Sequence, residues 1–145
     1  MDVLDTIINV LTNNWTASNT DSITPTIGRV TDYKRIDVAS TDWVLCYEID
    51  EIWEPNAIGG KEWATINDVS IDIRTTYNST MNVANLRSHV VKIADEVKRI
   101  IKANIANPDA NFQLLFLTRK KDLSDRSVGL GRMTIDVRLR NYGVT

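Results

Sequence analysis

The sequence predicts an α+β fold in which a mostly antiparallel sheet of four to five strands carries two amphipathic helices packed on one face. Apolar residues recur at helical spacing over residues 2–15 and 83–105, which is the pattern of a helix that buries one side. Apolar and polar residues alternate over residues 65–76 and 132–140. Such alternation is typical of strands in a sheet that is covered on one face only.

Length and composition fit one ordinary globular domain. The chain has 145 residues, of which 43% are hydrophobic and 25% charged, and its formal net charge is -2. We therefore expect a single domain over residues 1–145, with a core large enough to need no disulfide or metal. Cys46 and His89 are the single cysteine and histidine. They are too few for a disulfide framework or a cysteine–histidine zinc site within one subunit.

Charge and hydropathy also bear on location and partners. A net charge of -2 argues against a general nucleic-acid binder, which usually has a clear basic excess. No apolar run approaches the roughly 20 residues that span a bilayer, so we expect no membrane contact. The first ten residues include Asp2 and Asp5 and no Lys or Arg, unlike the basic start of a secretory signal. These features predict a soluble protein of the cytoplasm.

The chain is expected to open with a helix over residues 2–15. Asp2 is placed to cap its first turn, because a short acidic side chain can accept hydrogen bonds from the free amides there. Residues 16–26 are mostly polar and predict a loop. Residues 27–36 are expected to form a first, irregular strand.

The middle of the chain predicts two strands joined by an excursion. Residues 42–50 alternate as a strand does. Pro55 and the pair Gly59–Gly60 favour an excursion over residues 51–63. Residues 65–76 form the clearer strand, and its apolar face holds Val69, Ile71 and Ile73.

The C-terminal half predicts a long helix followed by two strands. Over residues 83–105 one stripe is apolar, and Asn82 could cap the start. The stripe consists of Val83, Leu86, Val90, Ile93, Val97, Ile100 and Ile101. Residues 112–120 predict a strand, residues 122–131 a turn, and residues 132–140 a final strand. Met133, Ile135, Val137 and Leu139 are expected to face inward, with Arg132, Thr134, Asp136, Arg138 and Arg140 on the opposite face.

Residue types that could carry out catalysis are present without a catalytic arrangement. His89 borders the apolar stripe of the long helix, where a boundary position is the simplest interpretation. Cys46 shares a strand face with Val44, which predicts a buried and unreactive thiol. The close carboxylate pairs are Glu48 with Asp50, Asp68 with Asp72, and Asp122 with Asp125. The first two pairs are expected to meet solvent. We predict no catalytic residue, no metal ligand and no cofactor.

Two surface features remain as candidate contact sites. The excursion carries large apolar side chains, namely Ile52, Trp53, Ile58 and Trp63. They either fold back on the core or form an interface, where tryptophan is enriched. The second feature is a basic segment with Arg119, Lys120, Lys121 and Arg126. It is either a solvated face or a contact with an acidic partner or with DNA phosphates, although Asp122, Asp125 and Asp136 offset part of its charge.

The order of elements resembles that of the tail terminator, or tail-completion, proteins of tailed bacterial and archaeal viruses. Residues 69–75 (VSIDIRT) look like the family's strand before the long helix, and residues 94–101 (ADEVKRII) are similar to part of that helix. Residues 133–139 (MTIDVRL) fit the closing strand, and residues 42–47 (DWVLCY) fit a strand before the excursion. The excursion itself matches nothing in the family pattern.

This resemblance implies a structural protein of the virion tail that is assembled in the host cytoplasm. Tail terminators form a ring, commonly a hexamer, that caps the tail tube, stops its polymerisation and offers a docking surface to the head. The implied partners are further copies of the chain, the tail tube protein, a neck or head-completion protein, and viral DNA in transit without sequence specificity. The candidate contact residues are Trp53, Ile58, Trp63, Arg119, Lys120, Lys121 and Arg126.

Three alternatives stay open at the level of sequence. Another head–tail connector, or neck, protein of the same particle has nearly the same layout. A small intracellular ligand-binding or adaptor module would require a deep apolar pocket with a few polar groups. A nuclease that uses Asp68 and Asp72 would require those carboxylates to converge on a metal ion.

Overall fold

The computed structural model describes residues 2–32, 42–55, 63–76, 83–125 and 130–142. Their helices and strands confirm the predicted α+β class. In chain order they are the helix α1 (Val3–Asn14), the 3-10 turn η1 (Ala17–Thr20), β1 (Thr26–Arg29), the 3-10 turn η2 (Val30–Asp32), β2 (Asp42–Pro55), β3 (Trp63–Thr76), α2 (Val83–Ala103), β4 (Leu114–Asp122) and β5 (Leu130–Asn141).

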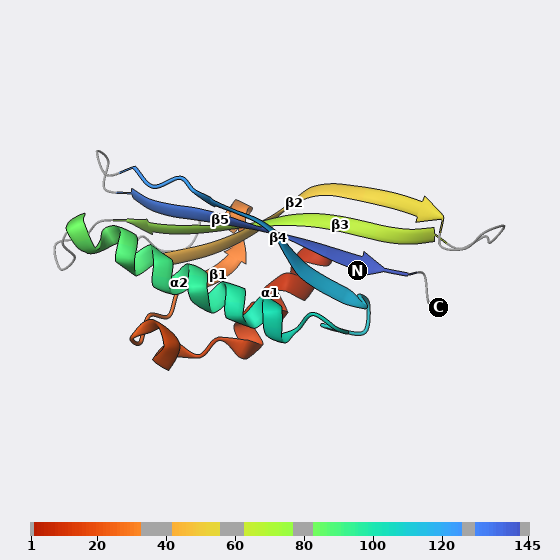
Figure 1. Ribbon diagram of the computed structural model, residues 1–145, viewed down its shortest axis with the longest axis horizontal. Coiled ribbons are helices and arrows are strands. Elements are labelled where there is room, and N and C mark those ends of the chain that lie inside the picture. The colour runs from red at the N-terminus through yellow and green to blue at the C-terminus, as the bar shows by residue number, and fades with distance from the viewer. Residues whose placement is uncertain (1, 33–41, 56–62, 77–82, 126–129, 143–145) are drawn as a thin grey trace.

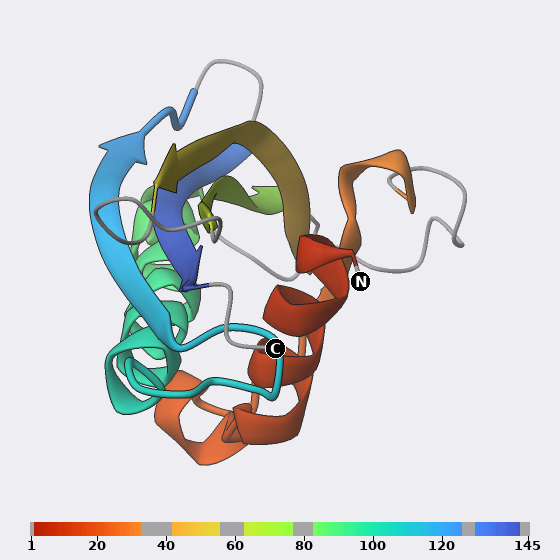
Figure 2. The same ribbon diagram turned by 90° about the vertical axis from the view of Figure 1, so that its right-hand side faces the viewer.

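Five strands form one sheet in the order β1-β2-β3-β5-β4. The pairs β2–β3, β3–β5 and β4–β5 are antiparallel, and β1 lies parallel to β2. Figure 1 shows both helices on one side of this sheet, and Figure 2 shows the strands curving around that side. The predicted arrangement of two helices on one face is therefore confirmed.

The core lies between the helices and the inner face of the sheet. The predicted stripe of α2 is buried from Leu86 to Ile101, and the inward residues of β5 are at most 1% exposed. At Gly131 the helix lies tightly against the sheet, since a Cβ there would lie 3.3 Å from the side chain of Leu86. The other core members include Val3, Ile7, Leu11, Val44, Cys46, Val69, Ile71, Ile73, Phe112 and Leu115.

Helix α1 is fixed at its start as the sequence predicts. The carboxylate of Asp2 accepts a hydrogen bond from the backbone amide of Leu4 at 3.0 Å, which satisfies one of the free amides of the first turn. Arg29 of β1 binds the carboxylates of Asp2 and Asp5, each at 2.5 Å. The hydrogen bond from Arg29 is the main reason that the pKa of Asp2 is lowered. The first turn of α1 is thus tied to the edge of the sheet.

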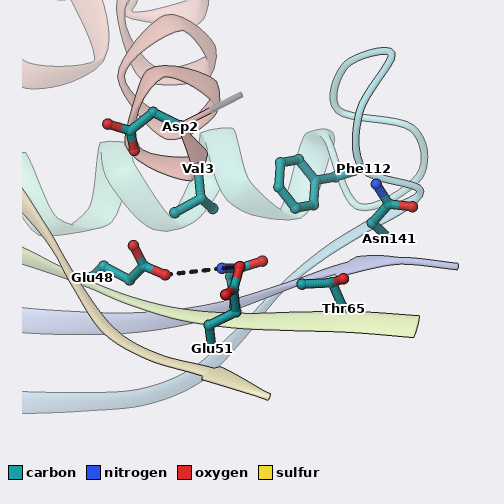
Figure 3. Close-up of a pocket in the computed structure, with 8 residues that line it drawn as sticks. Asp2, Val3, Glu48, Glu51, Thr65, Phe112 and Asn141 are labelled. Atoms are coloured by element: carbon teal, nitrogen blue, oxygen red, sulfur yellow. Dashed lines mark hydrogen bonds between the residues drawn. The ribbon is translucent and has the colours of Figure 1, made fainter. Parts of the chain in front are cut away.

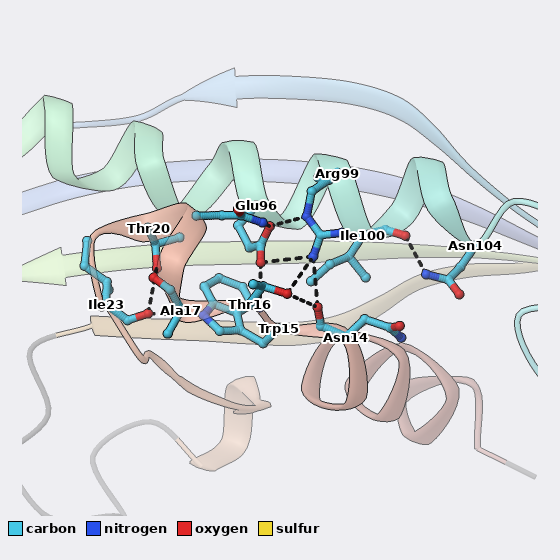
Figure 4. A network of polar contacts seen from close by, with 11 residues as sticks. Asn14, Trp15, Thr16, Ala17, Thr20, Ile23, Glu96, Arg99, Ile100 and Asn104 are labelled. Carbon is cyan, nitrogen blue, oxygen red and sulfur yellow. Dashed lines mark hydrogen bonds and ion pairs between the residues drawn. The ribbon is translucent and has the colours of Figure 1, made fainter.

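A buried carboxylate connects the end of α1 to α2. The side chain of Glu96 is fully buried and accepts hydrogen bonds from the amide of Thr16 at 2.7 Å and from Asn19 at 3.1 Å. Arg99, one turn further along α2, forms an ion pair with Glu96 and also donates to the carbonyl of Asn14 at 2.9 Å. Figure 4 shows these contacts converging from both elements. This network was not predicted from the sequence.

Several element boundaries differ from the prediction. The first strand, expected over residues 27–36, begins at Thr26 and ends at Arg29, where the 3-10 turn η2 follows. Residues 33–36 of the expected range lie outside the described residues. The strand expected over 42–50 continues to Pro55, and the next begins at Trp63, so residues 51–55 belong to a strand and not to an excursion. β4 and β5 pair as far as Asp122 opposite Met133. This pairing shortens the turn expected over residues 122–131. The proposed cap Asn82 lies outside the described residues.

The face of the sheet away from the helices is less open than its pattern predicts. Leu45 and Asp72 are 0% exposed and Ser70 is 1% exposed, although all three point to that face. Arg74 and Arg132 flank Asp72 and bind its carboxylate, and their long side chains help to exclude water from it. The expectation that Asp72 meets solvent is therefore wrong.

Candidate functional site

The end of β2 and the beginning of β3 form a paired arm. Their pairing continues without interruption from Asp50 opposite Asp68 to Pro55 opposite Trp63. β5 lies beside β3 in this arm as far as Asn141, opposite Thr65, so that Trp63 and Ala64 with their partners on β2 extend beyond β5. In Figure 1 the arm extends past α1 at one end of the molecule. We use the term arm for the described residues 50–55 and 63–67.

A β-bulge sets which side chains the arm presents. The register of β2 against β3 shifts between Glu48 and Asp50, and a bulge reverses the faces of the residues that follow it. Trp53 lies opposite Thr65, and Trp63 lies opposite Pro55. The two indoles are therefore diagonal neighbours on one face of the ribbon.

These tryptophans are exposed and do not fold back on the core. Trp53 is 62% exposed and Trp63 is 56% exposed, while Ile52 on the opposite face is 40% exposed. Of the two interpretations that the sequence left open, burial against the core is wrong for these residues. Exposed tryptophans this close together are uncommon on a monomer surface and typical of a contact site. Ile58 lies outside the described residues.

The arm is also acidic. Asp50, Glu51 and Glu54 are all exposed, and the described part of the arm contains no Lys or Arg. Asn67 donates a hydrogen bond to Glu48 at 3.0 Å and to Glu51 at 3.4 Å. These two hydrogen bonds hold the carboxylates of Glu48 and Glu51 together beside Asn67.

A polar hollow of about 350 Å³ lies between the base of the arm and the start of α1. Figure 3 shows carboxylates and amides around it, together with Phe112. Its lining residues are Asp2, Val3, Glu48, Glu51, Thr65, Asn67, Phe112 and Asn141. Among the described residues, no three His, Cys, Asp or Glu side chains are grouped in a way that could hold a metal ion. The hollow is not the deep apolar pocket that a ligand-binding module requires.

The basic segment lies at the end of β4. Arg119, Lys120 and Lys121 are all exposed. Arg119 forms an ion pair with Asp136 at 3.1 Å. Neither lysine forms an ion pair with any residue that the structure describes. Asp136 therefore offsets the charge of Arg119, whereas no described acid offsets the charge of either lysine. Arg126 lies outside the described residues.

A second hollow of about 400 Å³ lies beside this basic segment. It is lined by Leu86, Arg87, Asp122, Ser124 and Leu130. Arg87 and Asp122 form an ion pair across it at 3.3 Å. A hydrogen bond from the backbone amide of Ser124 is the main cause of the lowered pKa of Asp122. The hollow combines two leucines with a charged rim.

The carboxylates considered for metal binding are occupied by arginines. Asp72 accepts hydrogen bonds from Arg74 and Arg132 at 2.8 to 3.0 Å. Asp68 is bound by Arg138 through both carboxylate oxygens, at 2.7 and 3.0 Å. Such paired, charge-assisted bonds satisfy the lone pairs that a metal ion would need. This arrangement does not support a nuclease centre at these two residues.

The single histidine contacts a carboxylate that links two elements, and the single cysteine is buried in the core. Nε2 of His89 lies 2.7 Å from the carboxylate of Asp42, and this contact joins α2 to the start of β2. Cys46 is fully buried, and burial raises the pKa of its thiol to about 12. A thiol with such a pKa is protonated at neutral pH, whereas nucleophilic cysteines need an accessible thiolate.

Comparison with known proteins gives a match in structure and none in sequence. No family model matches the chain, and no curated protein sequence matches it. The fold is similar to a chain in the solved structure described as the virion of a native gene transfer agent (GTA) particle. The TM-score is 0.59 at 9% sequence identity, over 96% of this chain and 93% of that one. Within the described residues, no helix is both long and apolar enough to cross a membrane.

Proposed function

We propose that this chain is a structural protein of a tailed, virus-like particle that caps the tail tube as a closed ring. The observation that carries the proposal is the fold, which matches a chain of a gene transfer agent virion over nearly the full length of both. The exposed tryptophan arm supports it, as do Lys120 and Lys121 of β4, which form no ion pair with a described residue. Both are surfaces suited to contacts with other subunits. The proposed ring is a hexamer, as in the tail terminators that the sequence resembles.

In this proposal the protein acts by surface complementarity and without catalysis. Each subunit offers one surface to its neighbour, so that the contacts close by rotation into a ring. The ring covers the last layer of the tail tube protein and leaves no site for another layer. Its opposite side receives the neck or head-completion protein, and DNA passes through the lumen without being read in sequence.

The test is removal of the gene from cells that make the particle, followed by electron microscopy. Loss of a terminator leaves tails longer than normal and heads without tails, because nothing stops the tube. Loss of a neck protein leaves tails of normal length that do not join heads. Particles of normal length and assembly would show that the proposal is wrong. The isolated protein adds a second readout, since six copies of 16.4 kDa have a mass of about 98 kDa.

A further inference from the structure

The acidic arm and the basic end of β4 lie at opposite ends of the molecule. At one end, Thr65 of β3 pairs with the last residue of β5. At the other end, Lys121 and Asp122 of β4 pair with Thr134 and Met133, near the start of β5. Figure 1 shows the arm at one extreme and the starts of α2 and β5 at the other. Glu54 lies opposite Ala64 of β3, and Lys121 lies level with Asp72 of the same strand through Thr134 of β5. These levels are roughly 26 Å apart along the strand at ~3.3 Å per residue, so the two charged surfaces do not meet within one subunit.

The two ends have opposite charge. The described arm contains three exposed acids, Asp50, Glu51 and Glu54, and no described base. At the other end, the ion pairs Arg87–Asp122 and Arg119–Asp136 leave Lys120 and Lys121 unpaired among the described residues. Opposite potentials steer two surfaces together and fix their register, while like potentials keep two identical ends apart.

The two ends also match in shape and polarity. The arm presents Trp53 and Trp63 on one face, both more than half exposed. The basic end has a hollow of about 400 Å³ whose lining includes Leu86 and Leu130. A large aromatic side chain that enters a pocket with a polar rim is the usual centre of a protein contact. The rim here is the ion pair of Arg87 with Asp122.

We propose that the arm of one subunit docks on the basic end of a second copy of this chain. The indole face of the arm covers the hollow beside the start of α2, and Glu51 and Glu54 lie against Lys120 and Lys121. This inference rests on the proposed function, and it names the contact that would close the ring. Because the arm and its acceptor are different surfaces at opposite ends, the contact is head-to-tail and repeats from copy to copy.

Charge reversal on each end gives a direct test. One variant has a positive arm, Glu51→Lys with Glu54→Lys. The other has an acidic end, Lys120→Glu with Lys121→Glu. In each variant alone the arm and the acceptor carry charge of the same sign. In an equimolar mixture, every arm meets an acceptor of opposite sign, so subunits of the two kinds can alternate. A chain with all four substitutions should also associate with itself.

The measurement is the mass in solution by light scattering behind a sizing column, at concentrations up to about 1 mM. We expect wild type to form a species larger than a dimer, each variant alone to associate at least about tenfold more weakly, and the mixture and the four-substitution chain to recover. Lys102→Glu, on the exposed end of α2, is the matched control and should associate as wild type does. Circular dichroism confirms that each variant is folded.

The possible outcomes separate this inference from the proposed function. A wild type that is monomeric throughout, or that stops at a dimer, overturns the head-to-tail contact. A larger species that is insensitive to both reversals, or a mixture that does not recover, overturns the assignment of these surfaces. None of these results decides whether tails become overlong when the gene is removed, and that phenotype alone judges the function. Trp53→Ala with Trp63→Ala should weaken association without loss of fold.

Discussion

Single side chains in this protein act mainly by joining elements that are distant in the sequence. Glu96 joins α2 to the residues after α1 by accepting hydrogen bonds from the backbone amide of Thr16 and the side chain of Asn19. Burial alone would raise the pKa of Glu96, but the bonds from Arg99, Thr16 and Asn19 together outweigh it, and its pKa is lowered. A lowered pKa means that the folded protein binds the charged carboxylate better than the unfolded chain does.

This network predicts how stability depends on pH. Glu96 has an ordinary pKa of 4.5 when it is free of these contacts. Its contribution is fully present above that pH and is lost as the pH falls through the lower pKa of the folded state. Glu96→Gln should lower the free energy of unfolding at pH 7 by about 1 to 3 kcal/mol. It should also reduce the loss of stability below pH 4.5, as measured by urea unfolding at several pH values.

The matched control is Asp95→Asn, one residue away on the exposed side of α2. Asp95 pairs with Lys98 at the surface, where an ion pair contributes little. If Asp95→Asn and Glu96→Gln change the pH profile equally, the buried network has no special role.

Among single residues, the burial of Cys46 could be predicted from the sequence, whereas the burial of Asp72 could not. An apolar neighbour on the same strand face is enough to predict burial of a cysteine. An aspartate on an alternating polar face predicts exposure, and Asp72 is buried because Arg74 and Arg132 lie over it. The second of these arginines is 60 residues away in sequence. Only the register of β3 against β5 brings it close.

At the scale of elements, periodicity predicted the helices better than the strand ends. The stripes of α1 and α2 are long and regular, so both helices appear within two residues of the expected bounds. The sequence predicts an excursion over residues 51–63 because Pro55 and the pair Gly59–Gly60 are typical turn residues. Proline is tolerated where a strand ends, and pairing with β3 extends β2 as far as Pro55.

The packing of α2 on the sheet predicts a severe effect of a charge in its stripe. Ile93 is 0% exposed in the centre of the core. Ile93→Asp should lower the free energy of unfolding by more than about 4 kcal/mol, because an unpaired carboxylate would lie in an apolar environment. The expected result is an insoluble protein, or one without a cooperative thermal transition. Ser88→Asp, on the exposed face of the same helix, should fold normally.

At the scale of the whole molecule, we expect the tryptophans of the arm to contribute to assembly and little to the stability of the subunit. Because Trp53 and Trp63 are largely exposed, replacing both with alanine should change the free energy of unfolding by no more than about 0.5 kcal/mol each. Trp43 is the matched control, since it is 4% exposed, and Trp43→Ala should cost about 3 to 5 kcal/mol. Chemical denaturation of the arm variant and of Trp43→Ala tests this. A large loss of stability in the arm variant would show that the indoles pack within the subunit.

The arrangement of the whole molecule is the part of the candidate site that could not be predicted from the sequence. The tryptophans and the lysines were both candidates from their residue types alone. Their separation follows from the strand order β1-β2-β3-β5-β4 and from the registers of β2, β3, β4 and β5, which the sequence pattern does not contain. The bulge after Glu48, which determines the face on which Trp53 lies, leaves no clear signal in the sequence either.

The position of Lys120 and Lys121 has a further consequence for aggregation. β4 is the last strand of the sheet, and its outer side has backbone groups to which another strand could bind. Charged side chains on such a strand oppose the growth of the sheet into fibrils. Lys120→Thr with Lys121→Thr keeps the strand propensity and removes both charges. We expect this variant to form fibrils that bind thioflavin T at concentrations where wild type stays clear. The two lysines thus oppose fibril growth at the outer edge of the sheet.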